Sequence, residues 1–222
     1  MKWKFLYHIL ILYTVITFGY CCNKYNWNPF LTKTSPHLAI LILARGGSKG
    51  VHLKNIAKVN NTPLIRISLD SIKNVNFVHS VWVSTDHKNI FQEAEEENVN
   101  IHWRSAYTAT DTATSLVGIK EFLEHHPEID ILGLVQCTSP FIKRSYLQLA
   151  VDYMRDGLEC AFSVTRSHKL IWKETDNQVI PLNFNPYKRP RRQDWVGILI
   201  ENGMFYFATR NLIQKNTLQS LK

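Results

Sequence analysis

The sequence predicts an α/β protein in which helices cover a mostly parallel β-sheet. Short apolar runs alternate along the chain with segments whose apolar residues recur at helical spacing, which is typical of repeated strand–helix units. The first run, Leu38 to Leu43, is apolar without interruption, as expected for a strand buried on both faces. The chain has 222 residues, of which 45% are hydrophobic, and is therefore long enough to form one sizeable core.

The expected elements follow the first strand in order. Residues 56–65 predict a small hairpin, because Asn60 and Asn61 tolerate the backbone geometry of a tight turn. The segment 201–207, ENGMFYF, predicts a turn and then an aromatic strand. Helices are expected over 64–72, 89–97, 115–125 and 145–154, and further strands over 79–86, 99–104 and 157–165. Residues 130–140 predict a strand that runs into a polar turn closed by Pro140.

The N-terminal segment has the pattern of a targeting sequence. Lys2 and Lys4 precede a stretch from Phe5 to Cys22 that contains no acidic or basic residue apart from His8. Residues 1–22 are therefore expected to be a signal peptide or a signal anchor in the membrane, followed by a linker over 23–37 and one domain over 38–222. This predicts a location in the secretory pathway, in the Golgi lumen or membrane, where the sequon that begins at Asn60 would be open to glycosylation.

The net charge and the cysteines limit the classes of binding partner and of metal or disulfide site only in part. The formal net charge of +8 favours anionic partners such as nucleotides, acidic sugars, nucleic acids or anionic lipids. The four cysteines fit no zinc or disulfide framework by their spacing. Cys137 and Cys160 are expected to be small buried apolar residues, whereas Cys21 and Cys22 are candidates for lipid modification or removal by processing.

The segment LARGGSKGVHLKN, which ends the first strand, is the leading candidate for a phosphate-binding loop. It joins small residues to the cations Arg45, Lys49 and Lys54, but it matches neither the P-loop nor the dinucleotide-binding pattern. A plain surface turn is the alternative. Because ligands of parallel sheets bind at the carboxyl ends of strands, one shared polar site is expected from Arg45, residues 84–86, Arg104, Gln136 and residues 138–139.

The basic stretch 185–195, NPYKRPRRQDW, has three interpretations. It is a solvated loop, an import or nucleic-acid-binding patch centred on 188–192, or an active-site loop that holds an anion. The second interpretation would place the protein in the nucleus. Few aromatic residues are interleaved with these cations, so no nucleic-acid partner is expected.

Several segments, taken in order, resemble those of the animal N-acylneuraminate cytidylyltransferases. They are LARGGSKGVHLKN, VSTDH, DTATS, QCTSP, NPYKRPRRQDW and ENGMFYF, which together span about residues 38–212. The resemblance implies a three-layer Rossmann-like nucleotidyltransferase fold. It also implies CTP and a sialic acid, N-acetylneuraminate, as substrates, and CMP-sialic acid and pyrophosphate as products.

The resemblance also assigns residues to the site. It implies Arg191 as the catalytic arginine, with Arg189 and Arg192 as close alternatives, and Gln136 as a residue suited to the sugar. An arginine suits both carboxylate and phosphate because its planar donors bind two oxygens at once. The implied nucleotide-binding residues are Arg45, Lys54, Asn55, Arg104, Ala113 and Ser115.

Two departures from the family pattern bear on activity. His52 stands where the family usually has proline, and the family's DID-like pair of metal-binding aspartates has no counterpart up to Lys222. Magnesium is the cofactor that the family implies, but no metal ligand is assigned in this chain, which we expect to be C-terminally truncated. The complete family also implies a homo-oligomer. The alternative function is a non-catalytic sugar-nucleotide binder or an inactive truncated relative.

Overall fold

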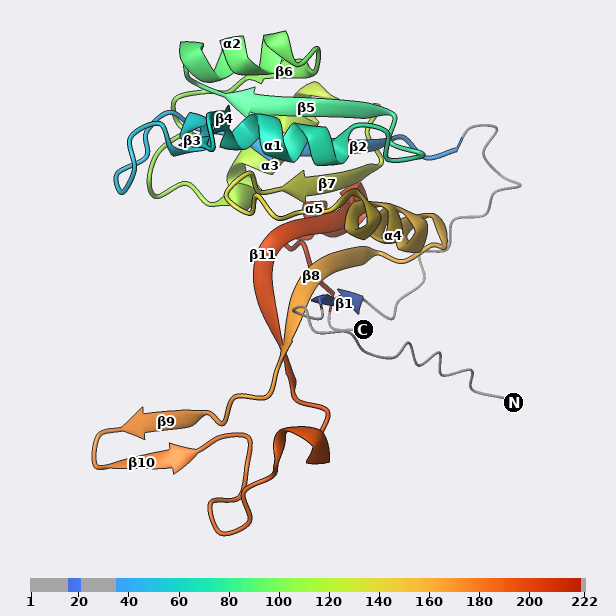
Figure 1. Cartoon of the computed structure of the whole chain (residues 1–222). Helices are drawn as coiled ribbons and strands as arrows, with labels where there is room; N and C mark the ends of the chain where they lie inside the picture. Colours follow the sequence, from blue (N-terminus) through green and yellow to red (C-terminus); the bar gives the residue numbers. More distant parts are fainter. Residues whose placement is uncertain (1–15, 21–34, 221–222) are drawn as a thin grey trace. The chain divides into compact units, whose positions relative to one another are not determined.

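A seven-stranded mixed sheet organises the part of the chain that the structure describes, residues 16–20 and 35–220 of the computed structural model (Figure 1). The strand order is β1-β8-β11-β7-β2-β5-β6. The bounds are β1 Ile16–Tyr20, β2 Leu38–Leu43, β5 Ser80–Thr85, β6 Asn100–Trp103, β7 Ile131–Val135, β8 Cys160–Ser167 and β11 Ile198–Thr209.

Four neighbouring strands make the parallel part of this sheet. β2 pairs in parallel with both β5 and β7, and β5 pairs in parallel with β6. β11 joins the other edge of β7 in the antiparallel direction, with Phe207 opposite Gly133. The expected mostly parallel α/β sheet is thus confirmed, and the uninterrupted apolar run of β2 is explained by its central position.

Helices cover the sheet and bury its apolar side chains. On one face, Ala39 and Leu41 of β2 share a core cluster with Phe122 of α3 and Leu212 of α5. Alternation along the strand turns Ile40 and Ile42 to the opposite face, where both are fully buried; Figure 1 draws α1 and α4 in front of the strands. The bounds are α1 Leu64–Ile72, α2 Lys88–Glu96, α3 Ser115–His125, α4 Arg144–Arg155 and α5 Arg210–Gln214.

The predicted hairpin is confirmed as β3, Lys58–Val59, paired with β4, Thr62–Pro63. Its turn residues Asn60 and Asn61 have φ angles of 49° and 64°, in the left-handed region that asparagine enters more readily than most residues. A short 3-10 helix, η1 Lys54–Ile56, directly precedes the hairpin.

The chain divides into two compact units. One unit comprises Phe18–Ser163 with Asn202–Lys222 and contains most of the main sheet and all five α-helices. The other comprises Met1–Thr17 with Val164–Glu201. Within its described residues lie the antiparallel pair β9 Trp172–Thr175 and β10 Gln178–Pro181, and the 3-10 helix η2 Arg192–Asp194.

Two sequence-based expectations were wrong. The turn expected at the start of ENGMFYF is absent, because β11 continues without a break through this segment, with Gly203 at a φ of 70° inside the strand. The expectation from the cysteine spacing, that no disulfide framework is present, was also wrong, because Cys160 is disulfide-bonded. The sequence spacing gave no sign of this bond, although the prediction that Cys160 and Cys137 are buried is confirmed.

The targeting prediction for residues 1–22 lies largely outside the described residues. Of that segment the structure describes Ile16–Tyr20, which forms β1. Within residues 16–20 and 35–220, none of the helices has the length and apolar character needed to cross a membrane. The linker expected over 23–37 is described only from residue 35 onward.

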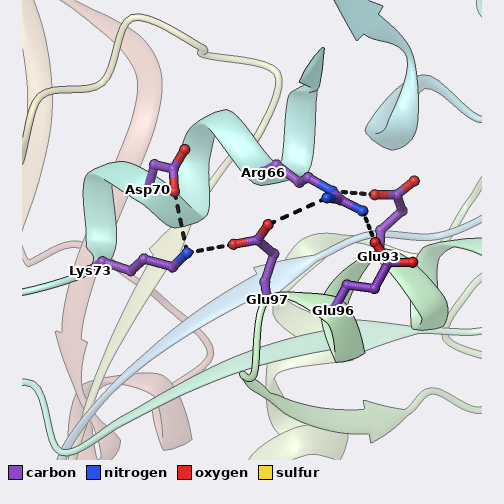
Figure 2. Close-up of polar contacts among 6 residues, drawn as sticks. All are labelled: Arg66, Asp70, Lys73, Glu93, Glu96 and Glu97. Carbon is purple, nitrogen blue, oxygen red and sulfur yellow. Dashed lines mark hydrogen bonds and ion pairs between the residues drawn. The ribbon is translucent and has the colours of Figure 1, made fainter. Parts of the chain in front are cut away.

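A network of ion pairs joins α1 to α2 and to Glu97, the residue after α2 (Figure 2). Arg66 donates to Glu93 at 2.5 Å and also to Glu96, and it lies 3.7 Å from Glu97. Lys73, which follows α1, contacts Glu97 at 2.5 Å and Asp70 at 3.3 Å. The acidic run of α2 is therefore neutralised in part by two cations of the neighbouring segment.

Candidate functional site

A cavity of about 190 Å³ opens at the carboxyl ends of the parallel strands. Its lining combines three cations with amide, hydroxyl and apolar groups. The lining residues are Leu43, Arg45, Ser48, Lys54, Asn55, Arg104, Ala113, Ser115, Leu134, Val135, Gln136, Cys137 and Thr138.

Seven of the eight residues that the family resemblance assigned to the site line this one cavity. Arg45 follows β2 by two positions, Arg104 directly follows β6, and Gln136 directly follows β7. Because parallel strands end at the same edge of the sheet, these three loops converge there. Ser115 is the first residue of α3, so the positive end of that helix dipole also faces the cavity.

Arg45 is held at the rim of the cavity by an acidic neighbour. Its Nη1 donates to Oδ1 of Asp111 at 2.5 Å, and Nζ of Lys49 lies 2.7 Å from Oδ2 of the same carboxylate. Hydrogen bonds from Lys49 and Arg45 lower the pKa of Asp111 from its ordinary value. A single carboxylate therefore binds two cations of the glycine-rich loop.

Arg104 is a buried cation, with only 5% of its surface exposed. Its Nε donates to Oγ1 of Thr108 at 3.2 Å, and its Nη2 donates to the Thr108 carbonyl oxygen. Burial lowers the pKa of Arg104 because the charged form loses its hydration. The guanidinium is thus fixed by its own loop and placed at the cavity wall.

Asn55 uses both ends of its side-chain amide inside the protein. Its Nδ2 donates to the carbonyl oxygen of Arg45 at 3.0 Å, and the thiol of Cys137 donates to its Oδ1 at 3.0 Å. Burial raises the pKa of Cys137 to about 12, so the thiol stays protonated at neutral pH. Asn55 consequently ties the loop after β2 to the end of β7.

The glycine-rich loop is anchored by the segment after β5. The amide N–H of Gly46 donates to Oδ1 of Asp86 at 2.8 Å. A Cβ at position 46 would lie 2.7 Å from Cδ2 of His87, so glycine is required there by a close approach of protein to protein. Further along, Leu53 has a φ of 46°, an unusual conformation for a bulky residue, directly before Lys54 and Asn55.

Arg191 does not line the cavity and lies in the other compact unit. Its side chain is 74% exposed and forms a bidentate pair with Asp194, from Nε at 2.9 Å and from Nη2 at 3.0 Å. These hydrogen bonds raise the pKa of Arg191 and lower that of Asp194. The alternative Arg189 lies over the ring of Phe184 at 5.7 Å.

Some lining residues were not assigned to the site from the sequence. Leu43, Leu134 and Val135 were expected only as buried strand residues, and nothing in an apolar run shows that its end borders a cavity. Cys137 was expected only as a core residue. Ser48 belongs to the predicted phosphate-binding loop, and Thr138 was expected in the shared polar site; both line the cavity, whereas residues 84–86 and 139, expected in the same site, do not.

The donor set of the described cavity does not fit a magnesium ion held by the protein. The lining contains three cations and no carboxylate, whereas Mg²⁺ prefers oxygen ligands that include carboxylates. The nearby carboxylates of Asp111 and Asp86 are engaged by Arg45, Lys49 and the Gly46 amide. Among the described residues, no group of three or more His, Cys, Asp or Glu side chains is placed to hold a metal.

The fold and the cavity together define a class of protein. A parallel sheet with a cation-lined cavity at its carboxyl edge, next to a helix N-terminus, is the arrangement of nucleotide-binding α/β proteins. Residues 39–221 match the family model described as cytidylyltransferase. The chain belongs to the cytidylyltransferase family.

Two fish relatives are similar to most of this chain. It is 43% identical over 195 residues to N-acylneuraminate cytidylyltransferase A of Danio rerio. This alignment covers 86% of this chain and 45% of the relative. It is 42% identical over 184 residues to N-acylneuraminate cytidylyltransferase of Oncorhynchus mykiss, covering 81% of this chain and 43% of the relative. The chain thus spans less than half the length of these curated relatives.

Solved structures confirm the fold. A CMP:2-keto-3-deoxy-manno-octonic acid synthetase, complexed with CTP, aligns with a TM-score of 0.61 at 21% identity over 83% of this chain and 80% of its own. A 4-diphosphocytidyl-2C-methyl-D-erythritol synthase from Anaerococcus prevotii aligns with a TM-score of 0.57 at 16% identity, over 84% of this chain and 79% of its own. The Rossmann-like nucleotidyltransferase fold expected from the sequence is therefore confirmed.

Proposed function

We propose that this protein transfers CMP from CTP to the anomeric hydroxyl of N-acetylneuraminate, with release of pyrophosphate. The observation that carries the proposal is the convergence of Arg45, Lys54 and Arg104 on one cavity at the carboxyl edge of the sheet. The similarity to relatives named N-acylneuraminate cytidylyltransferase supports sialic acid as the acceptor.

The lining residues suit the charge distribution of this reaction. The hydroxyl oxygen bonds to the α-phosphorus, the bond from that phosphorus to pyrophosphate breaks, and the hydroxyl proton passes to solvent. Catalysis of such transfers rests on positioning and on neutralising the phosphate oxygens. In the proposal Arg45, Lys54 and Arg104 hold phosphate groups, and the N-terminal turn of α3, with Ala113 and Ser115, borders the nucleoside.

In the proposed function, Gln136 and Arg191 act on the sialic acid acceptor. Gln136 lies at the end of β7, and its backbone N–H donates to the carbonyl of Met204, which fixes the loop. Its amide offers both donors and acceptors to sugar hydroxyls. Arg191 is proposed as the catalytic arginine; its guanidinium would have to leave Asp194 before it could bind a substrate oxygen.

In the proposed function, magnesium would enter the cavity bound to CTP. Because the described lining offers no carboxylate, any metal at this cavity would depend on oxygens of the nucleotide itself. Its chemistry would be to neutralise phosphate charge. The roles given above to Arg45, Lys54 and Arg104 do not require it.

We also propose that the protein forms a homo-oligomer. Apolar side chains are exposed in the Val164–Glu201 unit, a feature that supports an interface in a homo-oligomer; they are Trp172, Val179, Leu182, Tyr187, Val196, Leu199 and Ile200.

We also propose a location in the secretory pathway. The disulfide at Cys160 supports an oxidising compartment such as the Golgi lumen. A fluorescent fusion of the full chain that concentrates in the nucleus would favour residues 188–192 as an import signal instead.

Turnover of CTP and N-acetylneuraminate tests the central proposal. We expect CMP-sialic acid and pyrophosphate from the wild-type chain, and at least about tenfold weaker CTP binding by Arg45→Ala, since a charge-assisted hydrogen bond is lost. CTP binding without turnover would favour the non-catalytic binder. An absence of CTP binding by the folded wild-type protein would overturn the proposal.

A further inference from the structure

Arg104 is connected to an acidic residue of α3 through one intermediary. Thr108, which receives both hydrogen bonds from the Arg104 guanidinium, donates its own hydroxyl proton to Oε2 of Glu121. The other oxygen of the carboxylate, Oε1, accepts from the backbone N–H of Ser105 at 2.8 Å. Glu121 thus fixes two points of the 105–108 loop, and this loop holds Arg104.

The carboxylate of Glu121 is itself largely buried, with 12% of its side chain exposed. Burial alone would raise the pKa of Glu121, but hydrogen bonds from Thr108 and Ser105 outweigh it, and the pKa is lowered. The residue is therefore ionised at neutral pH. Its negative charge also favours the charged form of Arg104, against the effect of burial.

Gly118 supplies the space that the guanidinium occupies. It lies one helical turn before Glu121 in α3, and a Cβ there would stand 2.7 Å from Nη2 of Arg104 and 3.1 Å from its Cζ. Glycine is among the least favourable residues for the interior of a helix. The close approach of Arg104 gives a physical reason for this unfavourable choice.

We propose that Glu121 and Gly118 are positioning residues that set the orientation of Arg104 toward the nucleotide. The inference rests on the proposed function, in which Arg104 binds CTP. Glu121 acts through Thr108 and the loop, and Gly118 acts by leaving room for the guanidinium. Neither residue lines the cavity, so neither is expected to contact the nucleotide.

The first variant is Glu121→Gln, which keeps the size of the side chain and removes its charge and one acceptor. We expect its CTP dissociation constant, measured by calorimetry, to rise about tenfold, since a hydrogen bond to a charged group is weakened. Glu124→Gln is the matched control, because Glu124 is exposed on the same helix. In an Arg104→Ala background, Glu121→Gln should have no further effect on CTP affinity.

The second variant, Gly118→Ala, separates positioning from folding. Alanine favours the helix, so we expect little loss of thermal stability, yet the added methyl group should displace the guanidinium and weaken CTP binding severalfold. Full CTP affinity in both folded variants would overturn the inference.

A measurement on the nucleotide-free protein tests the positioning of Arg104 independently of the proposed function. In nitrogen-15 spectra of the wild-type protein, the Arg104 Nε–H should exchange slowly with water because it is buried and bonded to Thr108. We expect faster exchange in Glu121→Gln and a shifted signal in Gly118→Ala. An unchanged signal in both variants overturns the inference, whereas failure of the wild-type protein to bind CTP overturns only the proposed function.

Discussion

Arg45 donates a hydrogen bond of 2.5 Å to Asp111, 66 positions further along the chain. Lys49 binds the second oxygen of the same carboxylate at 2.7 Å. Asp111 thus pairs with Lys49 and with Arg45, and in the proposed function Arg45 binds a phosphate group of CTP. Nucleotide and carboxylate would therefore compete for the Arg45 guanidinium.

This competition predicts that Asp111→Asn binds CTP more tightly than the wild-type protein. We expect a gain of about two- to fivefold, since an exposed ion pair contributes little. Calorimetric titration measures it, with Asp156→Asn as a control because Asp156 is exposed at the end of α4. Weaker binding would instead mean that Asp111 helps to hold the nucleotide.

The thiol of Cys137 is expected to resist alkylation in the folded protein. Only 2% of Cys137 is exposed, and burial raises its pKa to about 12, so almost no reactive thiolate exists at pH 8. Peptide mapping after iodoacetamide treatment should show Cys137 unmodified in buffer and modified in denaturant. Rapid labelling in buffer would show that the contact with Asn55 opens readily.

Mild acid is expected to destabilise the fold through the buried His102 and the partly buried His37 and His126. Burial lowers the pKa of His102, an effect that Glu121 opposes and that His126, His125 and Arg104 reinforce. Because the unfolded state then binds protons at a higher pH, stability present above about pH 6.5 is lost as the pH falls. His37 and His126 have pKa values lowered mainly by burial and act in the same direction.

The measurement is the thermal midpoint at pH 7.5 and at pH 5.5. Carboxylates such as Glu121, whose pKa values are lowered, stay ionised throughout this range and do not contribute to the difference. We expect a lower midpoint at pH 5.5 and a smaller difference in His102→Gln. The exposed His52→Gln serves as control, and equal midpoints at both pH values would contradict the histidine argument.

Gly133→Ala is expected to destabilise the centre of the sheet. A Cβ at this position of β7 would overlap the ring of Phe207, which lies opposite on β11 and is fully buried. Overpacking of this kind costs about 1–3 kcal/mol, which denaturant titration resolves. Gly47→Ala, where a Cβ would meet no atom within 4 Å, should leave the unfolding free energy within about 0.5 kcal/mol.

The ion network of Figure 2 is expected to contribute modestly to stability. Arg66→Met removes three partners at once but should cost only about 1 kcal/mol, because the pairs lie near the surface. The loss should shrink in 1 M salt, where charges are screened beyond about 3 Å. The exposed Arg144→Met is the control, and a loss that is independent of salt would indicate packing by the Arg66 stem instead.

Most of the fold could be predicted because its signals are local. The run from Leu38 to Leu43 and the helical spacing over 64–72 and 115–125 match β2, α1 and α3 residue for residue. The turn expected within 201–203 failed because Asn202 and Gly203 are typical turn residues, whereas pairing with neighbouring strands keeps this segment extended. The disulfide at Cys160 was missed because such a bond is set by distance in space rather than by spacing in sequence.

The sequence by itself determined the chain order of the strands and helices within residues 38–165 and the residues at the strand ends, because apolar runs and small polar loops are encoded within a few positions. Only the tertiary structure decided how those residues are held. Asp111 meets Arg45, Cys137 meets Asn55, and Gly118 of α3 makes room for Arg104. These pairs are 14 to 82 positions apart in the numbering, and each depends on how strands and helices pack, so no local pattern could reveal them.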